Sequence, residues 1–106
     1  MNTAQIERAY DDLASARKVL FNASFKEADL KFMLDTAEAA ALLAGKITGK
    51  NPEERKASST MMFIEDRNHL EAAEQKKRQA QMEFDIAKYA VDKLELIMRG
   101  LEWTKE

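Results

Sequence analysis

The chain has 106 residues, carries a net charge of -2 and contains no cysteine. This length suits one small domain, and the lack of cysteine excludes disulfides, thiolate chemistry and cysteine-ligated metals. Apolar runs stay well short of the ~20 residues of a membrane span, and the first residues lack the pattern of a signal peptide. We therefore expect no membrane partner and a cytoplasmic location.

Apolar residues recur at alternating spacings of three and four along most of the chain. This period indicates helices that pair along one face, which we call the seam. The predicted fold is all-α: a single domain, residues 1–106, formed by a long antiparallel, coiled-coil-like two-helix hairpin. The two series are Ile6, Ala9, Leu13, Ala16, Leu20 and Ala23, and Leu70, Ala73, Lys77, Ala80, Phe84, Ala87, Val91, Leu94, Met98 and Leu101.

Capping and turn residues set the bounds of the predicted hairpin. Asn2 and Gln5 have the spacing of a capping box at the start of the first helix. Gly45 suits the left-handed residue that follows a helix, while Asn51 and Pro52 suit the N-cap and first position of the next helix. The predicted elements are a helix over 3–44, a turn over 45–51 and a helix over 52–103.

The register of the hairpin stays open at this level. Facing residues of an antiparallel pair have a constant sum of residue numbers; a sum near 100 fits the turn best and a sum of 107 ranks second. Glu27 and Lys77 interrupt the seams, and we expect them to pair across the hairpin or to fix its register. Residues 58–60, Ser-Ser-Thr, are the weakest helical stretch and a possible interruption of the second helix.

A second set of apolar side chains lies away from the seams. Leaving such a set in water would exceed the apolar patches that soluble monomers usually expose. We therefore predict a homo-oligomer, a dimer or higher, in which hairpins associate into a four-helix or larger bundle. The predicted interface residues are Phe21, Phe25, Phe32, Met82, Ile86, Tyr89, Leu96 and Trp103.

Residues capable of catalysis are scarce. His69 is the sole histidine and follows Asp66 by three positions, a spacing related to the Glu-x-x-His of di-iron bundles. A half-size ferritin-like di-iron protein is thus a remote alternative, with Asp35, Glu38 or Glu27 as a further ligand. A lone Asp-x-x-His is common by chance in a charged helix, so we predict no enzyme, no metal and no cofactor.

The turn is the most basic part of the chain. Residues 46–56 sum to a charge of +2, while each flank sums to -2. We predict that this tip contacts an anionic surface, either an acidic patch on a protein or, with weaker support, nucleic-acid phosphate. The basic run at 76–78 is interpreted as a solvated helix face. The predicted binding residues at the tip are Lys46, Lys50, Arg55 and Lys56.

The nine residues at 47–55, Ile-Thr-Gly-Lys-Asn-Pro-Glu-Glu-Arg, resemble the turn of small helical-hairpin proteins encoded by bacteriophages and prophages. Those proteins also join two helices through a Gly-Lys-Asn turn, and they generally lack an assigned function. The resemblance implies a phage origin and a location inside a bacterial host cell. We expect a non-enzymatic interaction protein that binds a host or phage protein, in phage DNA metabolism or in inhibition of a host factor. The alternative is a structural, scaffold-like assembly protein.

Overall fold

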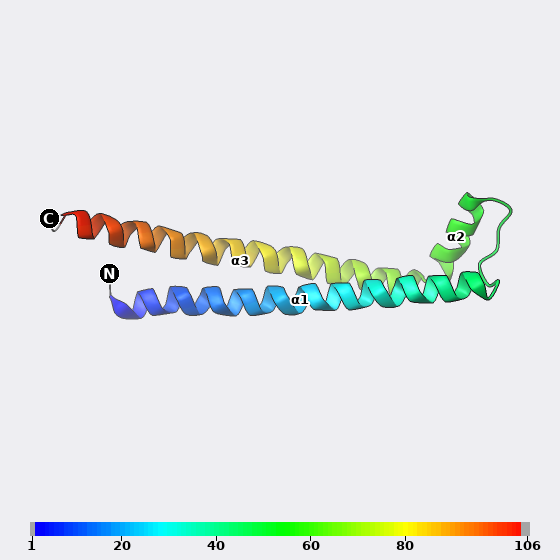
Figure 1. Ribbon diagram of the computed structural model, residues 1–106, viewed down its shortest axis with the longest axis horizontal. Coiled ribbons are helices and arrows are strands. Elements are labelled where there is room, and N and C mark those ends of the chain that lie inside the picture. Colours follow the sequence, from blue (N-terminus) through cyan, green and yellow to red (C-terminus); the bar gives the residue numbers. More distant parts are fainter. Residues whose placement is uncertain (1, 105–106) are drawn as a thin grey trace. The chain divides into compact units, whose positions relative to one another are not determined.

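The computed structural model describes the backbone of residues 2–104 and the side chains of residues 2–101. The regular structure in this part is helical: α1 spans Thr3–Leu43, α2 spans Pro52–Met62 and α3 spans Ile64–Thr104 (Figure 1). Because α1 and α3 pack against each other, the predicted all-α helical hairpin is confirmed. None of the described helices combines the length and apolar character that crossing a membrane requires.

The chain divides into two compact units. Unit 1 comprises Met1–Ala23 and Lys77–Glu106, and unit 2 comprises Ser24–Lys76. Unit 1 therefore pairs the first part of α1 with the second part of α3. Unit 2 holds the rest of both helices together with the turn and α2, so each unit has its own section of the seam.

In unit 1 the predicted seam is the covered face of both helices. Ala80 and Val91 are buried. Leu13, Leu20 and Phe84 were expected to be buried as well, but they are only half-buried. A single pair of helices covers a large side chain from one side only, so these residues keep part of their surface in water.

The cross-helix contacts fix a register between the two predicted ones. The residue numbers add up to 105 in Tyr10–Glu95 and to 101 in Arg17–Phe84, both in unit 1. In unit 2 they add up to 105 in Glu38–Arg67. These sums lie between the two predicted values, and the sum of 101 is close to the first of them. Small residues of the two long helices leave shallow grooves beside the seam in each unit.

In unit 2 the end of α1 is a Schellman motif. The Gly45 N–H donates to the Leu42 carbonyl at 3.1 Å, and the Lys46 N–H donates to the Ala41 carbonyl at 2.9 Å. Gly45 has a φ of +72°, so the left-handed residue predicted at this position is confirmed. The helix ends at Leu43, one residue before the predicted end.

The start of α2 follows the predicted capping chemistry. Asn51 is extended at φ -144° and ψ 169°, and its side chain accepts the Glu54 N–H at 2.8 Å. The Glu54 carboxylate in turn accepts the Lys50 N–H at 2.7 Å. Gly49 has a φ of +152°, and a Cβ built there would lie 2.6 Å from the Arg55 nitrogen. This close approach of loop to helix requires glycine.

The second predicted helix, 52–103, is wrong as a single element, because it is interrupted at Phe63 between α2 and α3. The interruption lies just after the hydroxyl-rich stretch. There the Thr60 hydroxyl donates to the Lys56 carbonyl at 2.9 Å, a bond that competes with regular helix geometry. Ser58 accepts the Thr48 N–H at 3.3 Å, and Ser59 is buried. These small residues let α2 fold back toward the turn within unit 2, at a steep angle to α1 (Figure 1).

The capping box predicted at the start of α1 is also present. The Gln5 N–H donates to the Asn2 side-chain oxygen at 2.8 Å, and the Asn2 N–H donates to the Gln5 side-chain oxygen at 3.2 Å. Both bonds satisfy N–H groups that a helix start otherwise leaves without partners.

Candidate functional site

The basic turn of unit 2 presents its cations to solvent. Lys46, Lys50, Arg55 and Lys56 are all exposed. Two hydrogen bonds, from the Thr48 N–H to the Ser58 hydroxyl and from the Lys50 N–H to the Glu54 carboxylate, join the loop to α2. Within the described residues, none of these four side chains forms an ion pair. The predicted tip therefore exists as a basic surface; its binding partner stays a prediction.

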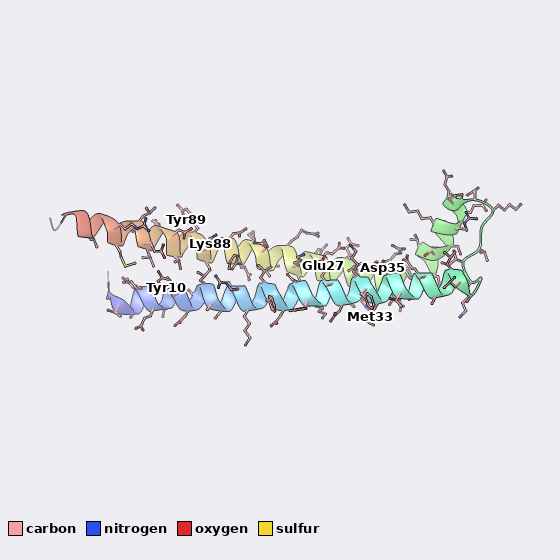
Figure 2. The ribbon with its side chains drawn as sticks, in the orientation of Figure 1. Tyr10, Glu27, Met33, Asp35, Lys88 and Tyr89 are labelled. Atoms are coloured by element: carbon pink, nitrogen blue, oxygen red, sulfur yellow. The ribbon has the colours of Figure 1, made fainter. Side chains whose placement is uncertain are left out.

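The apolar side chains predicted to form an oligomer interface are exposed wherever they are described. In unit 1, Ile86 and Tyr89 expose 62% and 70% of their surface. Tyr89 lies on the side of α3 that faces away from α1 (Figure 2). The side chain of Trp103 lies outside the described residues. The remaining exposed members are Phe21, Met82 and Leu96 in unit 1, and Phe25 and Phe32 in unit 2.

The seam of unit 2 carries a polar contact that the sequence analysis missed. The Arg67 guanidinium donates to the Glu38 carboxylate, and both side chains are partly covered. The Arg67 Nε atom is buried without a hydrogen-bond partner, so its desolvation is only partly offset. Arg67 lies three positions before Leu70, so the spacing of the second seam, continued toward the N-terminus, predicts its place on the seam. Glu27 and Lys77 are half-buried, and the ion pair predicted between them stays a prediction.

Unit 1 holds two further polar contacts between α1 and α3. The Arg17 guanidinium lies 5.8 Å from the centre of the Phe84 ring, a cation–π distance. The Tyr10 hydroxyl donates to the Glu95 carboxylate at 2.9 Å. This hydrogen bond, reinforced by partial desolvation and by the negative charges of Glu95 and Asp92, raises the pKa of Tyr10 above its ordinary value.

The residues considered for a di-iron site do not gather. The described part of the chain contains no group of three or more His, Asp or Glu side chains that could hold a metal ion. Glu38, one of the candidate ligands, is engaged by Arg67. His69 and Asp66 instead line shallow depressions beside the seam of unit 2, together with apolar residues.

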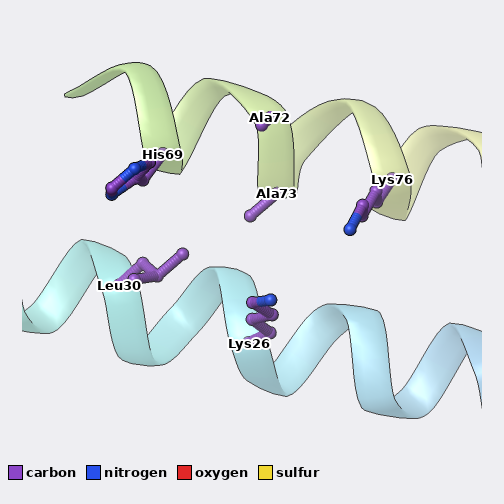
Figure 3. A pocket seen from close by; sticks show the side chains of 6 residues that line it. All are labelled: Lys26, Leu30, His69, Ala72, Ala73 and Lys76. Atoms are coloured by element: carbon purple, nitrogen blue, oxygen red, sulfur yellow. The ribbon is translucent and has the colours of Figure 1, made fainter. Parts of the chain in front are cut away.

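Unit 2 contains a groove with a basic rim and an apolar floor. It has a volume of about 380 Å³, and Lys26, His69 and Lys76 stand around it. Figure 3 shows Lys76 pointing from α3 toward α1 and the Lys26 ammonium beside the space between the helices. We call this the basic groove. Its floor consists of Leu30, Ala72 and Ala73.

Unit 1 contains a groove of nearly equal size with a more acidic rim. Its volume is about 370 Å³, and Asp12 and Glu83 line it, one from each long helix, together with Gln5 and Arg8. We call this the acidic groove. Its apolar lining is Ala9, Ala16, Ile86, Ala87 and Ala90. Neither groove was predicted from the sequence, because each is lined by residues of both long helices and so depends on how the helices pair.

Comparison of the chain with protein-family models, with curated proteins and with solved structures finds no match. The resemblance of the turn to phage-encoded hairpins therefore stays a prediction.

Proposed function

We propose that this protein acts by binding, without catalysis, and that the first partner of the chain is a second copy of itself. The observation that carries the proposal is the set of exposed apolar side chains on α3, represented by Ile86 and Tyr89. The hairpin uses one face of each helix, and the rest of this apolar surface lies in water. Association of two hairpins into a four-helix bundle removes such surface from water, and it needs no further segment of the chain to cover that surface.

The basic tip supplies the second half of the proposed function. Lys50 and Arg55 are exposed beside the N-terminus of α2, where the helix dipole adds partial positive charge. Such a surface suits an acidic patch on a host or phage protein, and the extended phosphate backbone of a nucleic acid less well because the chain as a whole carries a net charge of -2. Self-association would present two tips per assembly and so strengthen binding to a partner with two sites.

We further propose that the protein acts in the cytoplasm of a bacterium that carries a phage or prophage. An accessory role in phage DNA metabolism or inhibition of a host factor fits a small binding protein of this kind. A scaffold-like role is the alternative, and the form of the assembly separates the two. A small closed oligomer supports the binding role, whereas an open polymer supports the scaffold.

The proposal is tested by sedimentation of the unmodified protein and of Ile86→Asp at tens of micromolar. We expect the parent to form a closed oligomer and Ile86→Asp to dissociate it, because a buried carboxylate without a partner is strongly unfavourable. Lys88→Asp, at an exposed polar position on the same helix, is the matched control and should associate like the parent. A parent that sediments as a monomer in this concentration range refutes the proposal.

A further inference from the structure

The basic groove is bordered by two lysines and a histidine that are not paired with carboxylates in the described part of the chain. Within the described residues, neither Lys26 nor Lys76 nor His69 makes an ion pair. The residues three and four positions from Lys76 on either side are alanine or glutamine, so its own helix offers it no carboxylate at pairing distance. Two ammonium groups from opposite helices thus border one apolar floor, an arrangement that favours an external negative charge.

The acidic groove carries the complementary features. Asp12 and Glu83 border it from opposite helices, as Lys26 and Lys76 border the basic groove. Glu83 receives only a long hydrogen bond of 3.5 Å from Gln79. Arg8 also lines the acidic groove, so its rim is not uniformly negative. The two grooves match in volume, and each has a floor in which alanine predominates.

The Ile86 side chain has a shape that fits the basic groove. It lines the acidic groove and exposes 62% of its surface. Ala72 and Ala73 in the floor of the basic groove leave room for a branched side chain, and Leu30 adds apolar contact. A protruding side chain that enters a space between four or more residues is how paired helices pack. The aliphatic stems of Lys26 and Lys76 can cover its flanks while their charges stay at the rim.

We propose that two copies of this chain bind each other groove to groove, with Ile86 beside the acidic groove of one copy entering the basic groove of the other. Asp12 and Glu83 of the first copy then face Lys26 and Lys76 of the second. Each copy carries both halves of the contact, so every copy can both present its Ile86 and receive the Ile86 of another copy. The inference rests on the self-association proposed above and adds which surfaces meet.

The test is a charge swap split between two variants. The first variant, Lys26→Glu with Lys76→Glu, makes both grooves acidic, and the second, Asp12→Lys with Glu83→Lys, makes both basic. Each variant alone should raise the dissociation constant of self-association by about tenfold or more, because like charges then face each other. An equimolar mixture should form heterodimers with an affinity near that of the parent, because every facing charge is again opposite.

Sedimentation at low salt measures all of these species, and circular dichroism checks that each variant keeps the parent's helix content. Lys18→Glu with Lys93→Glu applies the same change of charge at exposed positions outside both grooves and should associate like the parent. If the parent associates but either split variant self-associates as tightly, or if the mixture stays monomeric, the groove contact is overturned while the proposed function stands. If the parent is monomeric, the proposed self-association itself fails, and the groove contact with it.

Discussion

Gly49→Ala should be the most destabilising of the possible glycine substitutions in this chain. At a φ of +152° the backbone conformation is one that side-chain-bearing residues rarely adopt, and holding such a conformation costs about 1–3 kcal/mol. The new Cβ would also lie 2.6 Å from the Arg55 nitrogen and 2.8 Å from the Glu54 Cβ. The start of α2 must therefore shift, which puts at risk a cap worth about 1 kcal/mol. The expected loss in unfolding free energy is about 2–4 kcal/mol.

Two other glycines are matched controls for this substitution. Gly45 also has a positive φ, +72°, but a Cβ there meets nothing within 4 Å, so Gly45→Ala should cost only about 1 kcal/mol, near the lower end of the cost of a left-handed residue. Gly100 lies inside α3 with open space around it, and Gly100→Ala should stabilise by about 0.5–1 kcal/mol. Urea denaturation followed by circular dichroism, at one fixed protein concentration, ranks the three variants. A loss at Gly49 no larger than the loss at Gly45 would refute the steric argument.

Three further substitutions test other parts of the molecule. Leu34→Ala should cost about 2–5 kcal/mol by denaturation, because Leu34 is buried in the seam of unit 2; a loss below about 1 kcal/mol would mean that its site collapses freely. Lys50→Gln with Arg55→Gln should change stability by less than about 0.5 kcal/mol and should weaken partner binding in a salt-dependent way; unchanged binding at low salt would reduce the tip to a turn. Because the folded-state pKa of Tyr10 is raised, its hydrogen bond to Glu95 stabilises the fold below the ordinary value of 10.0 and is lost as the pH rises through the folded pKa. Tyr10→Phe should therefore flatten the alkaline loss of stability, and a pH profile identical to the parent's would contradict that assignment.

Local signals in the sequence were sufficient for the helices and for most of their ends. The alternating spacing predicted both faces of the seam, and Asn2, Gly45 and Asn51 marked ends where the structure has a capping box, a Schellman motif and an N-cap. These features depend on residues within a few positions of each other, so the sequence carries them directly. The interruption at Phe63 was located only approximately, because the hydroxyl-rich stretch weakens the helix without fixing where it ends.

Of the candidate surfaces, some follow from local sequence and others depend on the tertiary structure. The exposed apolar set and the basic tip follow from helical periodicity and local composition, and both are exposed in the structure as the patterns indicated. The grooves could not be predicted, because they bring together residues about 40 to 85 positions apart in the chain.

The sequence by itself determined that this protein is helical, where its main turn lies and which faces of its helices are apolar, since each is a property of neighbouring residues. The tertiary structure decided the register, because sums of 100, 107 and the observed intermediate values all place apolar residues on the seam. The pairing of the two long helices also brings together the residues that line the two grooves, in which the proposed contact between copies is formed.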